Sequence, residues 1–279
     1  MRDRNFCAGP AAIPEPVLEE VRSELLEWGN AGMSIMEMSH RSSIFDEVAS
    51  NAKQDFIELL NIPDEYDVLF LQGGATHQFS MVPLNFSSQE DSADYLVSGA
   101  WSKKAIVEGQ KYSKINIVAS SEADNFTHVP DSKHWNLDPN AKYFHYAPNE
   151  TIQGVAIHQP PDIDVPIVAD MSSVILSEPI DVSKFGLIYA GAQKNIGPAG
   201  LTIVIIRKEM FEKENSSNSN ILRYSQHSKN NSMLNTPPTF SWYMAGKVFK
   251  WLKSEGGLEV ICKKNHFKAN TLYQYIDES

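Results

Sequence analysis

The stretch LIYAGAQKNIGPAGLTIVII, Leu187–Ile206, predicts two buried β-strands joined by a loop of small residues. The run Leu187–Tyr189 forms the first strand and Leu201–Ile206 the second, because both are rich in β-branched or aromatic residues. Between them, Gly, Ala and Pro surround Lys194 and leave room for a ligand close to its amino group. Partial burial would lower the pKa of that amine, as in lysines that form Schiff bases. A solvated lysine without a chemical role is the alternative.

Similar short apolar runs alternate with helical patterns along the chain from about residue 14. The further strand candidates are Val68–Leu71, Tyr95–Val97, Ile115–Val118, Tyr143–Tyr146 and Ile167–Ala169. Strands that alternate with helices are typical of α/β proteins with a largely parallel sheet. We therefore expect an α/β fold in which helices flank one mostly parallel, seven-stranded sheet.

The helical patterns have recognisable ends. Pro14 begins a helix that is expected to stop at Gly29, and Ser43 is expected to cap a second helix that runs to about Leu60. In the last forty or so residues, apolar side chains recur at helical spacing in two segments, which predicts two more helices. The Asn- and Ser-rich segment Glu212–Ser232 predicts an exposed loop.

Composition excludes several classes of protein. With 42% hydrophobic and 21% charged residues, the 279-residue chain is typical of ordinary globular proteins. A net charge of −11 with scattered Lys and Arg argues against a nucleic-acid surface. No stretch approaches the roughly 18 to 20 apolar residues of a membrane span, and the start lacks a signal peptide, so we expect a cytoplasmic protein. The distant cysteines Cys7 and Cys262 predict reduced thiols and no metal site.

Further candidate functional residues fall just after predicted strands, where α/β sheets bind ligands. Gly73 and Gly74 stand between a strand and a helix whose N-terminus could hold a phosphate, although many such junctions are only tight turns. Asp170 ends a strand and could pair with a protonated pyridine nitrogen, although such residues often cap helices. Trp101 follows another strand and could stack on an aromatic ring, or simply pack in the core.

A resemblance to one known family accounts for these candidate residues together. The chain resembles phosphoserine aminotransferase, a family of fold-type I pyridoxal phosphate enzymes, in the strings NFCAGPAAIP, MSIMEMSHRS, VADMSS, YAGAQKNIGPAGL and LNTPPT. The resemblance implies that pyridoxal 5'-phosphate is the cofactor and that Lys194 forms its Schiff base. It also implies that Asp170 pairs with the pyridine nitrogen and that Trp101 stacks on the cofactor ring.

The same resemblance implies roles for other residues. Ala75 and Thr76 would contact the cofactor phosphate, and Thr151 and Gln193 would also contact the cofactor. A further pair, Asn235 and Thr236, would reach the phosphate bound in the neighbouring subunit, which implies a homodimer with shared sites. The substrate carboxylate would be held by Arg41 and the adjacent His40, because a guanidinium offers two parallel hydrogen bonds to a carboxylate.

The implied reaction transfers an amino group from glutamate to 3-phosphohydroxypyruvate in a ping-pong cycle and gives O-phosphoserine and 2-oxoglutarate. Family members can also act on the analogous phosphohydroxythreonine precursor in pyridoxine biosynthesis. The loop at the start of the chain departs from the family pattern. Many members have a serine in this loop, whereas this chain has Cys7 and Ala8 before Gly9.

The resemblance also implies a division into domains. Residues 1–15 would be an N-terminal segment, 16–256 the large cofactor-binding domain, and 257–279 the start of a small α/β domain. That small domain would be incomplete, because the last helical pattern is still in progress at Tyr275. The family's second substrate-binding arginine belongs to the part of that domain beyond Ser279.

Alternatives remain open at this point. Another fold-type I enzyme is one, such as an alanine–glyoxylate-type aminotransferase or a cysteine desulfurase, although neither cysteine lies in a loop suited to the latter. A nucleotide-binding protein is a second, although the G-x-G-x-x-G spacing is missing. A catalytically silent protein that binds the cofactor is a third.

Overall fold

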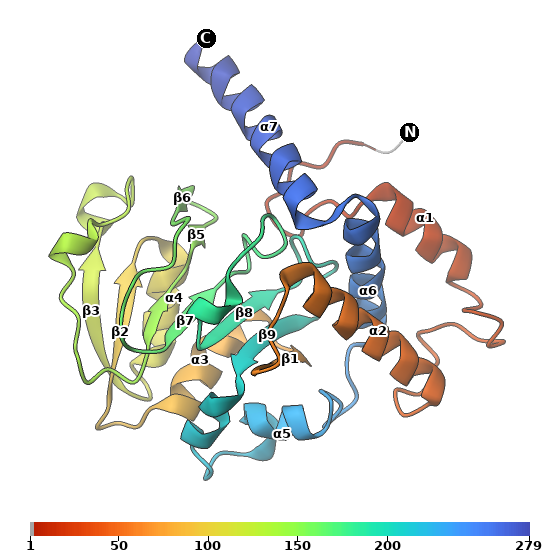
Figure 1. Ribbon diagram of the computed structural model, residues 1–279, viewed down its shortest axis with the longest axis horizontal. Coiled ribbons are helices and arrows are strands. Elements are labelled where there is room, and N and C mark those ends of the chain that lie inside the picture. Colours follow the sequence, from red (N-terminus) through yellow and green to blue (C-terminus); the bar gives the residue numbers. More distant parts are fainter. Residues whose placement is uncertain (1–2) are drawn as a thin grey trace.

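The computed structural model describes residues 3–279 and has helices on both faces of a seven-stranded sheet (Figure 1). The helices are α1 (Glu15–Glu24), α2 (Ser43–Leu60), α3 (Gly74–Phe86), α4 (Ala100–Gly109), α5 (Tyr224–Lys229), α6 (Thr239–Ser254) and α7 (Gly257–Asp277). The strands of the large sheet are β1 (Tyr66–Leu71), β2 (Ser92–Val97), β3 (Lys114–Ser120), β4 (Phe144–Tyr146), β7 (Ile167–Asp170), β8 (Leu187–Gly191) and β9 (Thr202–Arg207). A small antiparallel pair, β5 (Asn149–Glu150) and β6 (Val155–Ala156), lies outside it.

The order of strands in the large sheet is β1-β9-β8-β7-β4-β2-β3. Only β9 runs antiparallel to its neighbours, so the expected mostly parallel sheet is confirmed. Each of the predicted strands is present in it, with slightly different ends. Because β1, β2, β4, β7 and β8 are parallel, their carboxyl ends meet at one edge, which is where ligands bind in such sheets.

The loop that carries Lys194 connects two paired strands. In the β8–β9 register Leu187 faces Ile206 and Gly191 faces Thr202. Just beyond the register, the backbone N–H of Ala192 donates to the carbonyl of Leu201 over 3.0 Å. Both ends of the loop are therefore fixed by the sheet.

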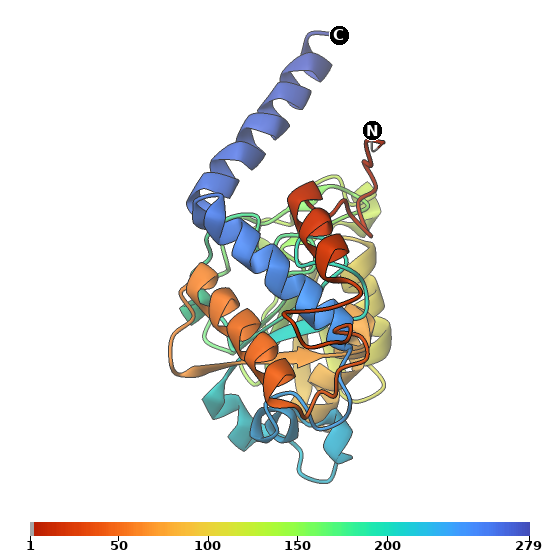
Figure 2. The same ribbon diagram turned by 90° about the vertical axis from the view of Figure 1, so that its right-hand side faces the viewer.

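One face of the sheet is covered by α2 and α6, which pack against each other (Figure 2). The ring of Phe70 in β1 stacks on Trp242 of α6, with ring centroids 4.4 Å apart. Phe56 of α2 meets Phe249 of α6 at 5.1 Å. All four side chains are buried, so this aromatic layer holds the helices against the sheet.

Helices α3 and α4 cover the opposite face, which contains a buried polar row. The hydroxyl groups of Tyr95 and Tyr143 lie 2.8 Å apart, and Nε2 of His145 lies 2.7 Å from the hydroxyl of Tyr189. Burial lowers the pKa of His145 to about 3, so this imidazole is neutral at physiological pH. The row is thus a network of neutral hydrogen bonds inside the core.

Two helix boundaries differ from the predictions. Helix α1 ends at Glu24, before the predicted end at Gly29, and the following residues form bends and turns. The cap of α2 is Ser42, whose hydroxyl accepts a hydrogen bond from the N–H of Phe45 over 3.2 Å, while Ser43 is the first helical residue. The side-chain acceptor therefore lies one residue earlier than predicted.

The prediction of an exposed loop over residues 212–232 is wrong in part, because the segment contains α5 and several buried side chains. Tyr224 stacks on Phe86 of α3 with ring centroids 5.7 Å apart and donates to the amide oxygen of Gln78 over 2.7 Å. Glu214, also buried, accepts from the N–H of Ser225 over 2.9 Å. The partners of Tyr224 are distant in sequence, so local composition could not reveal them, whereas Ser225 lies within the same segment as Glu214.

Helix α7 projects beyond the body of the molecule (Figures 1 and 2). Its distal half exposes several large apolar side chains, namely Phe267, Leu272, Tyr273, Tyr275 and Ile276. Within residues 3–279, none of the helices combines the length and the apolar character needed to cross a membrane.

Candidate active site

Lys194 lies in the β8–β9 loop, where its side chain is about half-buried. Its Nζ donates to Oγ1 of Thr151 over 2.5 Å and also donates to the hydroxyl of Ser173. The two hydroxyl oxygens are themselves 2.5 Å apart, so the three groups form a closed triangle. Burial lowers the pKa of Lys194, although the negative charges of Asp170 and Glu150 partly oppose that effect. The predicted lysine is therefore held by residues from two other loops, with a larger uncharged fraction than a solvated lysine.

Asp170 ends β7 and is buried, with 6% of its surface exposed. Its Oδ1 accepts hydrogen bonds from the N–H and the hydroxyl of Ser172, at 3.0 and 2.6 Å. The Ser172 hydroxyl in turn accepts from the N–H of Gly191 in β8 over 3.0 Å, which ties the ends of the two strands together. Burial raises the pKa of Asp170 to about 6 despite these hydrogen bonds.

No Lys or Arg in residues 3–279 forms a salt bridge with Asp170, although Lys194 is close enough to influence its pKa. A buried carboxylate normally has a cationic partner, because an unpaired charge in a low-dielectric environment is unfavourable. A protonated pyridine nitrogen would be such a partner. The observed environment of Asp170 therefore fits the cofactor that the sequence predicts.

Trp101 lies in the first turn of α4, and a buried glutamate determines its position. Glu150 Oε2 accepts from the N–H of Trp101 over 2.9 Å, and Oε1 accepts from the N–H and the hydroxyl of Ser102, at 2.8 and 2.7 Å. A carboxylate at this end of a helix satisfies free N–H groups and interacts favourably with the helix dipole. A Cβ atom on Gly99 would lie only 2.4 Å from the carboxyl carbon of Glu150, so the cap needs a glycine there.

The indole of Trp101 is partly buried and its Nε1 has no hydrogen-bond partner within the described chain. Nζ of Lys104 lies 4.3 Å from the centroid of the ring. Thr151, the partner of Lys194, directly follows the glutamate that caps α4. Trp101 and Lys194 are thus linked through two adjacent residues.

The β1–α3 junction presents an open helix N-terminus, as predicted from its two glycines. Gly73 and Gly74 have φ angles of 94° and 67°, in the left-handed region that favours glycine, and no side chain caps the helix. Ala75 is partly buried and Thr76 is exposed in the first turn that follows. Free N–H groups and the dipole of a 13-residue helix make this end suited to an anion such as a phosphate.

Asn235 and Thr236 lie beside the same junction in the same chain, because Nε2 of Gln72 donates to the carbonyl of Thr236 over 3.0 Å. Both residues are exposed, and Asn235 lines a cavity of about 370 Å³ together with Gly73 and His77. The structure does not bring this pair into contact with Lys194, so its predicted role depends on a second subunit.

Arg41 and His40 lie in the loop before α2. The Arg41 side chain is exposed, and its N–H donates to the hydroxyl of Ser39 over 3.2 Å. Within residues 3–279 the guanidinium forms no salt bridge, and the buried Nε2 of His40 has no partner. These residues also remain apart from the group around Lys194.

The N-terminal segment lies directly against the lysine loop. The N–H of Ala11 donates to the carbonyl of Gln193 over 2.8 Å, and a Cβ atom on Gly9 would lie 3.2 Å from two carbons of the Lys194 side chain. Next to Lys194, Gln193 is partly buried and folds its carboxamide back over Gly191. Only a very small residue fits at position 9 without moving the lysine.

The sequence predictions missed Ser173, Ser172 and Glu150. The two serines stand two and three positions after the predicted Asp170, so the string ADMSS contained a usable signal. For Glu150 there was no such signal, since its partners in α4 are 48 and 49 positions away and ordinary surface glutamates look the same.

Comparison with known proteins agrees with this geometry. The model of the class-V aminotransferase family matches residues 4–279. The phosphoserine aminotransferase of Hahella chejuensis is 54% identical over 282 residues, which cover 100% of this chain and 78% of the relative. That of Acinetobacter baylyi is 53% identical, with the same coverage.

Solved structures show the same similarity. Phosphoserine aminotransferase from Bacillus circulans subsp. alkalophilus superimposes with a TM-score of 0.95 at 44% identity, covering 98% of this chain and 76% of that chain. The pyridoxal phosphate-bound enzyme from Trichomonas vaginalis gives a TM-score of 0.94 at 41% identity, covering 100% of this chain and 83% of that chain. The chain therefore belongs to the class-V aminotransferase family and, within it, to the phosphoserine aminotransferases.

Proposed function

We propose that this protein transfers the amino group of glutamate to 3-phosphohydroxypyruvate, with pyridoxal 5'-phosphate bound at Lys194, and so forms O-phosphoserine and 2-oxoglutarate. The observation that carries the proposal is the arrangement of Lys194. Its amine meets Thr151 and Ser173 beside the buried Asp170, which is what a Schiff-base lysine with a pyridine-binding carboxylate requires. The class-V family match supports the same chemistry.

Pyridoxal phosphate, when bound, supplies an aldehyde carbon that carries the amino group and a ring that withdraws electrons from the reacting carbon. Lys194 would hold it, and the lysine amine would move a proton at the substrate Cα, a task that suits an amine whose pKa is lowered by burial. Thr151 and Ser173 orient that amine. The ionised Asp170 keeps a proton on the pyridine nitrogen, which maintains the electron-withdrawing power of the ring.

Other residues bind the cofactor and fix its position. The first turn of α3, with Ala75 and Thr76, holds the cofactor phosphate through backbone N–H groups. Trp101 stacks on the cofactor ring from its fixed place at the start of α4. Gln193 provides a further polar contact beside Lys194.

The substrate and the second subunit meet this site at exposed residues. Arg41 and His40 bind the anionic groups of the substrate, since the guanidinium has no carboxylate partner within residues 3–279. Asn235 and Thr236 reach the phosphate in the neighbouring subunit of a homodimer, which explains why a polar pair stands exposed next to the β1–α3 junction.

We also propose the cellular and structural context. The protein functions in the cytoplasm in serine biosynthesis, and activity on the related phosphohydroxythreonine precursor would add a role in pyridoxine biosynthesis. Residues 16–256 form the cofactor-binding domain after the N-terminal segment 1–15, and residues 257–279 begin a small domain. The exposed apolar side chains of α7 and the greater length of the curated relatives support the last assignment.

The proposal is tested by the absorption spectrum of the protein with pyridoxal phosphate, before and after glutamate, in the parent and in Lys194→Ala. We expect a visible band of the lysine-bound cofactor that disappears with glutamate as the pyridoxamine form accumulates, and no such band in the variant. Lys184→Ala is the control. Lys184 is exposed and lies just before β8, the strand that leads to Lys194, so this variant should keep the band. A glutamate-sensitive band that survives in Lys194→Ala contradicts the assignment. Turnover of 3-phosphohydroxypyruvate then tests the substrate.

A further inference from the structure

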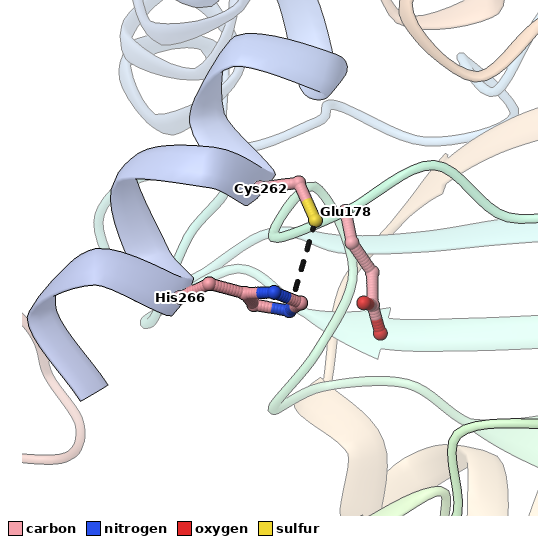
Figure 3. A group of neighbouring side chains, drawn as sticks. All are labelled: Glu178, Cys262 and His266. Carbon is pink, nitrogen blue, oxygen red and sulfur yellow. Dashed lines mark hydrogen bonds between the residues drawn. The ribbon is translucent and has the colours of Figure 1, made fainter. Parts of the chain in front are cut away.

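Three side chains with metal-binding atoms meet where α7 passes the loop after β7 (Figure 3). Cys262 and His266 are four residues apart on α7 and therefore lie on one face of the helix. Glu178 approaches them from the loop. The thiol, imidazole and carboxylate each place a ligand atom within 4.8 Å of the other two. None of these residues belongs to the group around Lys194.

The distance between the two ligand atoms on α7 is close to what a zinc ion needs. With Zn–S bonds of about 2.3 Å and Zn–N bonds of about 2.0 Å, tetrahedral geometry separates sulfur and nitrogen by about 3.5 Å. Cys262 Sγ and His266 Nε2 are 3.8 Å apart, so they need to move only slightly. Cys262 and Glu178 are partly buried and His266 is exposed, so solvent ions can reach the site.

A separate contact fixes the two halves of the cluster relative to each other. Asn265, between the two helix ligands, donates from Nδ2 to the carbonyl of Ser177 over 2.9 Å, and Ser177 directly precedes Glu178. The helix and the loop are thus already docked without an ion. Little conformational entropy would be lost on binding, because the ligand-bearing backbones are in place.

We infer that Glu178, Cys262 and His266 form a binding site for Zn²⁺ or a similar borderline-soft divalent cation. Thiolate, imidazole and carboxylate are the ligands zinc uses in proteins, whereas Mg²⁺ and Ca²⁺ prefer sites made of oxygen atoms. Three protein ligands leave one tetrahedral position for water or a small anion. Glu178 and His266 also line a cavity of about 500 Å³, which gives that position room.

The site has a structural consequence for the region around Lys194. Glu178 lies in the same loop as Ser173, whose hydroxyl accepts a hydrogen bond from Lys194. The ion would therefore join α7 to the loop that orients this lysine. Spacing of the two cysteines alone gave no hint of a metal site, because one ligand is far away in sequence and Cys7 takes no part.

The inference is tested by isothermal titration of the cofactor-loaded protein with Zn²⁺. The protein is first treated with a chelator and freed of unbound cofactor. We expect one equivalent to bind and to raise the melting temperature, because a ligand that binds only the folded state stabilises it. Changes to partners outside the coordination sphere alter metal affinity by about 10- to 100-fold, so loss of a direct ligand should weaken binding by at least about 100-fold. Cys262→Ser and His266→Gln should both show this loss.

Matched controls separate this site from other weak binding. Cys7→Ser removes the other thiol, and Glu259→Gln removes an exposed carboxylate of α7 outside the cluster, so both should bind Zn²⁺ like the parent. Substitution of Co²⁺ adds a direct readout, since a cobalt–thiolate bond gives a charge-transfer band that Cys262→Ser would lack. Absence of Zn²⁺ binding by the parent, or equal binding by Cys262→Ser, His266→Gln and the controls, overturns the inference.

Discussion

Oγ1 of Thr151 lies 2.5 Å from Nζ of Lys194, and both groups also contact the hydroxyl of Ser173. The lysine amine is thus held by one residue from the loop after β5 and another from the loop after β7. Because each hydroxyl restrains the other, the position of the amine depends on both loops.

Ser173→Ala should lower kcat by about 10- to 100-fold, because hydrogen bonds to charged groups contribute about 1.5–3 kcal/mol and each 1.4 kcal/mol is a factor of ten. Thr151 remains as a partner, so activity should fall without disappearing. Steady-state turnover of 3-phosphohydroxypyruvate measures the effect. Ser177→Ala is the control, since that hydroxyl lies in the same loop but donates only to the carbonyl of Val174. Equal kcat values for the two variants would show that the Ser173 hydroxyl does not orient the amine.

Asp170→Asn should lower kcat by about 100-fold, equivalent to about 2.7 kcal/mol, because the amide cannot keep a proton on the pyridine nitrogen. Asp181 provides a closely matched control. Its Oδ1 accepts from the N–H and the hydroxyl of Ser183 at 3.0 and 2.6 Å, the same distances as in the Asp170–Ser172 pair, but it is exposed. Asp181→Asn should retain full activity. If both variants lose activity alike, local turn geometry rather than the buried charge is responsible.

Stability of the cofactor-free protein should also depend on the ionisation of Asp170. Its pKa is about 6 in the folded state and 3.8 in the reference state, so the folded protein holds the proton more tightly. Stability therefore decreases as pH rises from about 4 to about 6 and remains lower above that range. The difference between the two pKa values corresponds to about 3 kcal/mol.

In urea unfolding experiments, cofactor-free Asp170→Asn should accordingly be more stable than the parent at pH 8, with the advantage shrinking towards pH 4. With pyridoxal phosphate bound, the order at pH 8 should reverse, since the parent then has a cationic partner for the carboxylate. An Asp170→Asn variant that is less stable than the parent at pH 8 without cofactor would contradict this account of the buried charge.

The fold was predictable because its signals are local. Each strand of the large sheet is a short apolar run, such as Leu187–Tyr189, and each run is separated from the next by helical or turn residues. The errors arose where distant partners determine the structure. Tyr224 is buried inside a segment whose composition predicts a loop, because Phe86 and Gln78 of the distant helix α3 contact its ring and its hydroxyl.

The residues of the candidate site also fall into two groups, those that local sequence indicates and those that depend on distant partners. Lys194, Asp170 and Trp101 stand at or just after the ends of strands and can be proposed from sequence as candidates, and the structure places Thr151 in contact with Lys194. In contrast, Arg41 and Asn235 remain apart from Lys194, and their predicted roles need a substrate or a second subunit. Residues whose function is to support others, such as Glu150, have no local pattern that distinguishes them.

Glu150 gives the sharpest test of such a supporting role. It is fully buried, and its carboxylate accepts three hydrogen bonds, all from Trp101 and Ser102 at the start of α4. Glu150→Gln replaces one acceptor oxygen by an NH₂ group that faces donors, and it removes the negative charge from the helix N-terminus. We expect a loss of about 2–4 kcal/mol in the free energy of unfolding, measured in urea.

A matched control is another glutamate that contacts α4 from outside the helix. Glu122 pairs with Lys103 of α4 at the protein surface, and exposed ion pairs contribute only up to about 1 kcal/mol, so Glu122→Gln should change stability little. The two variants carry the same chemical change and differ in burial and in the groups they contact. Because Glu150 also fixes Trp101, Glu150→Gln should weaken pyridoxal phosphate binding at temperatures where the protein is still folded. Cofactor affinity that stays at the parent value in folded Glu150→Gln would mean that Trp101 is positioned by its packing alone.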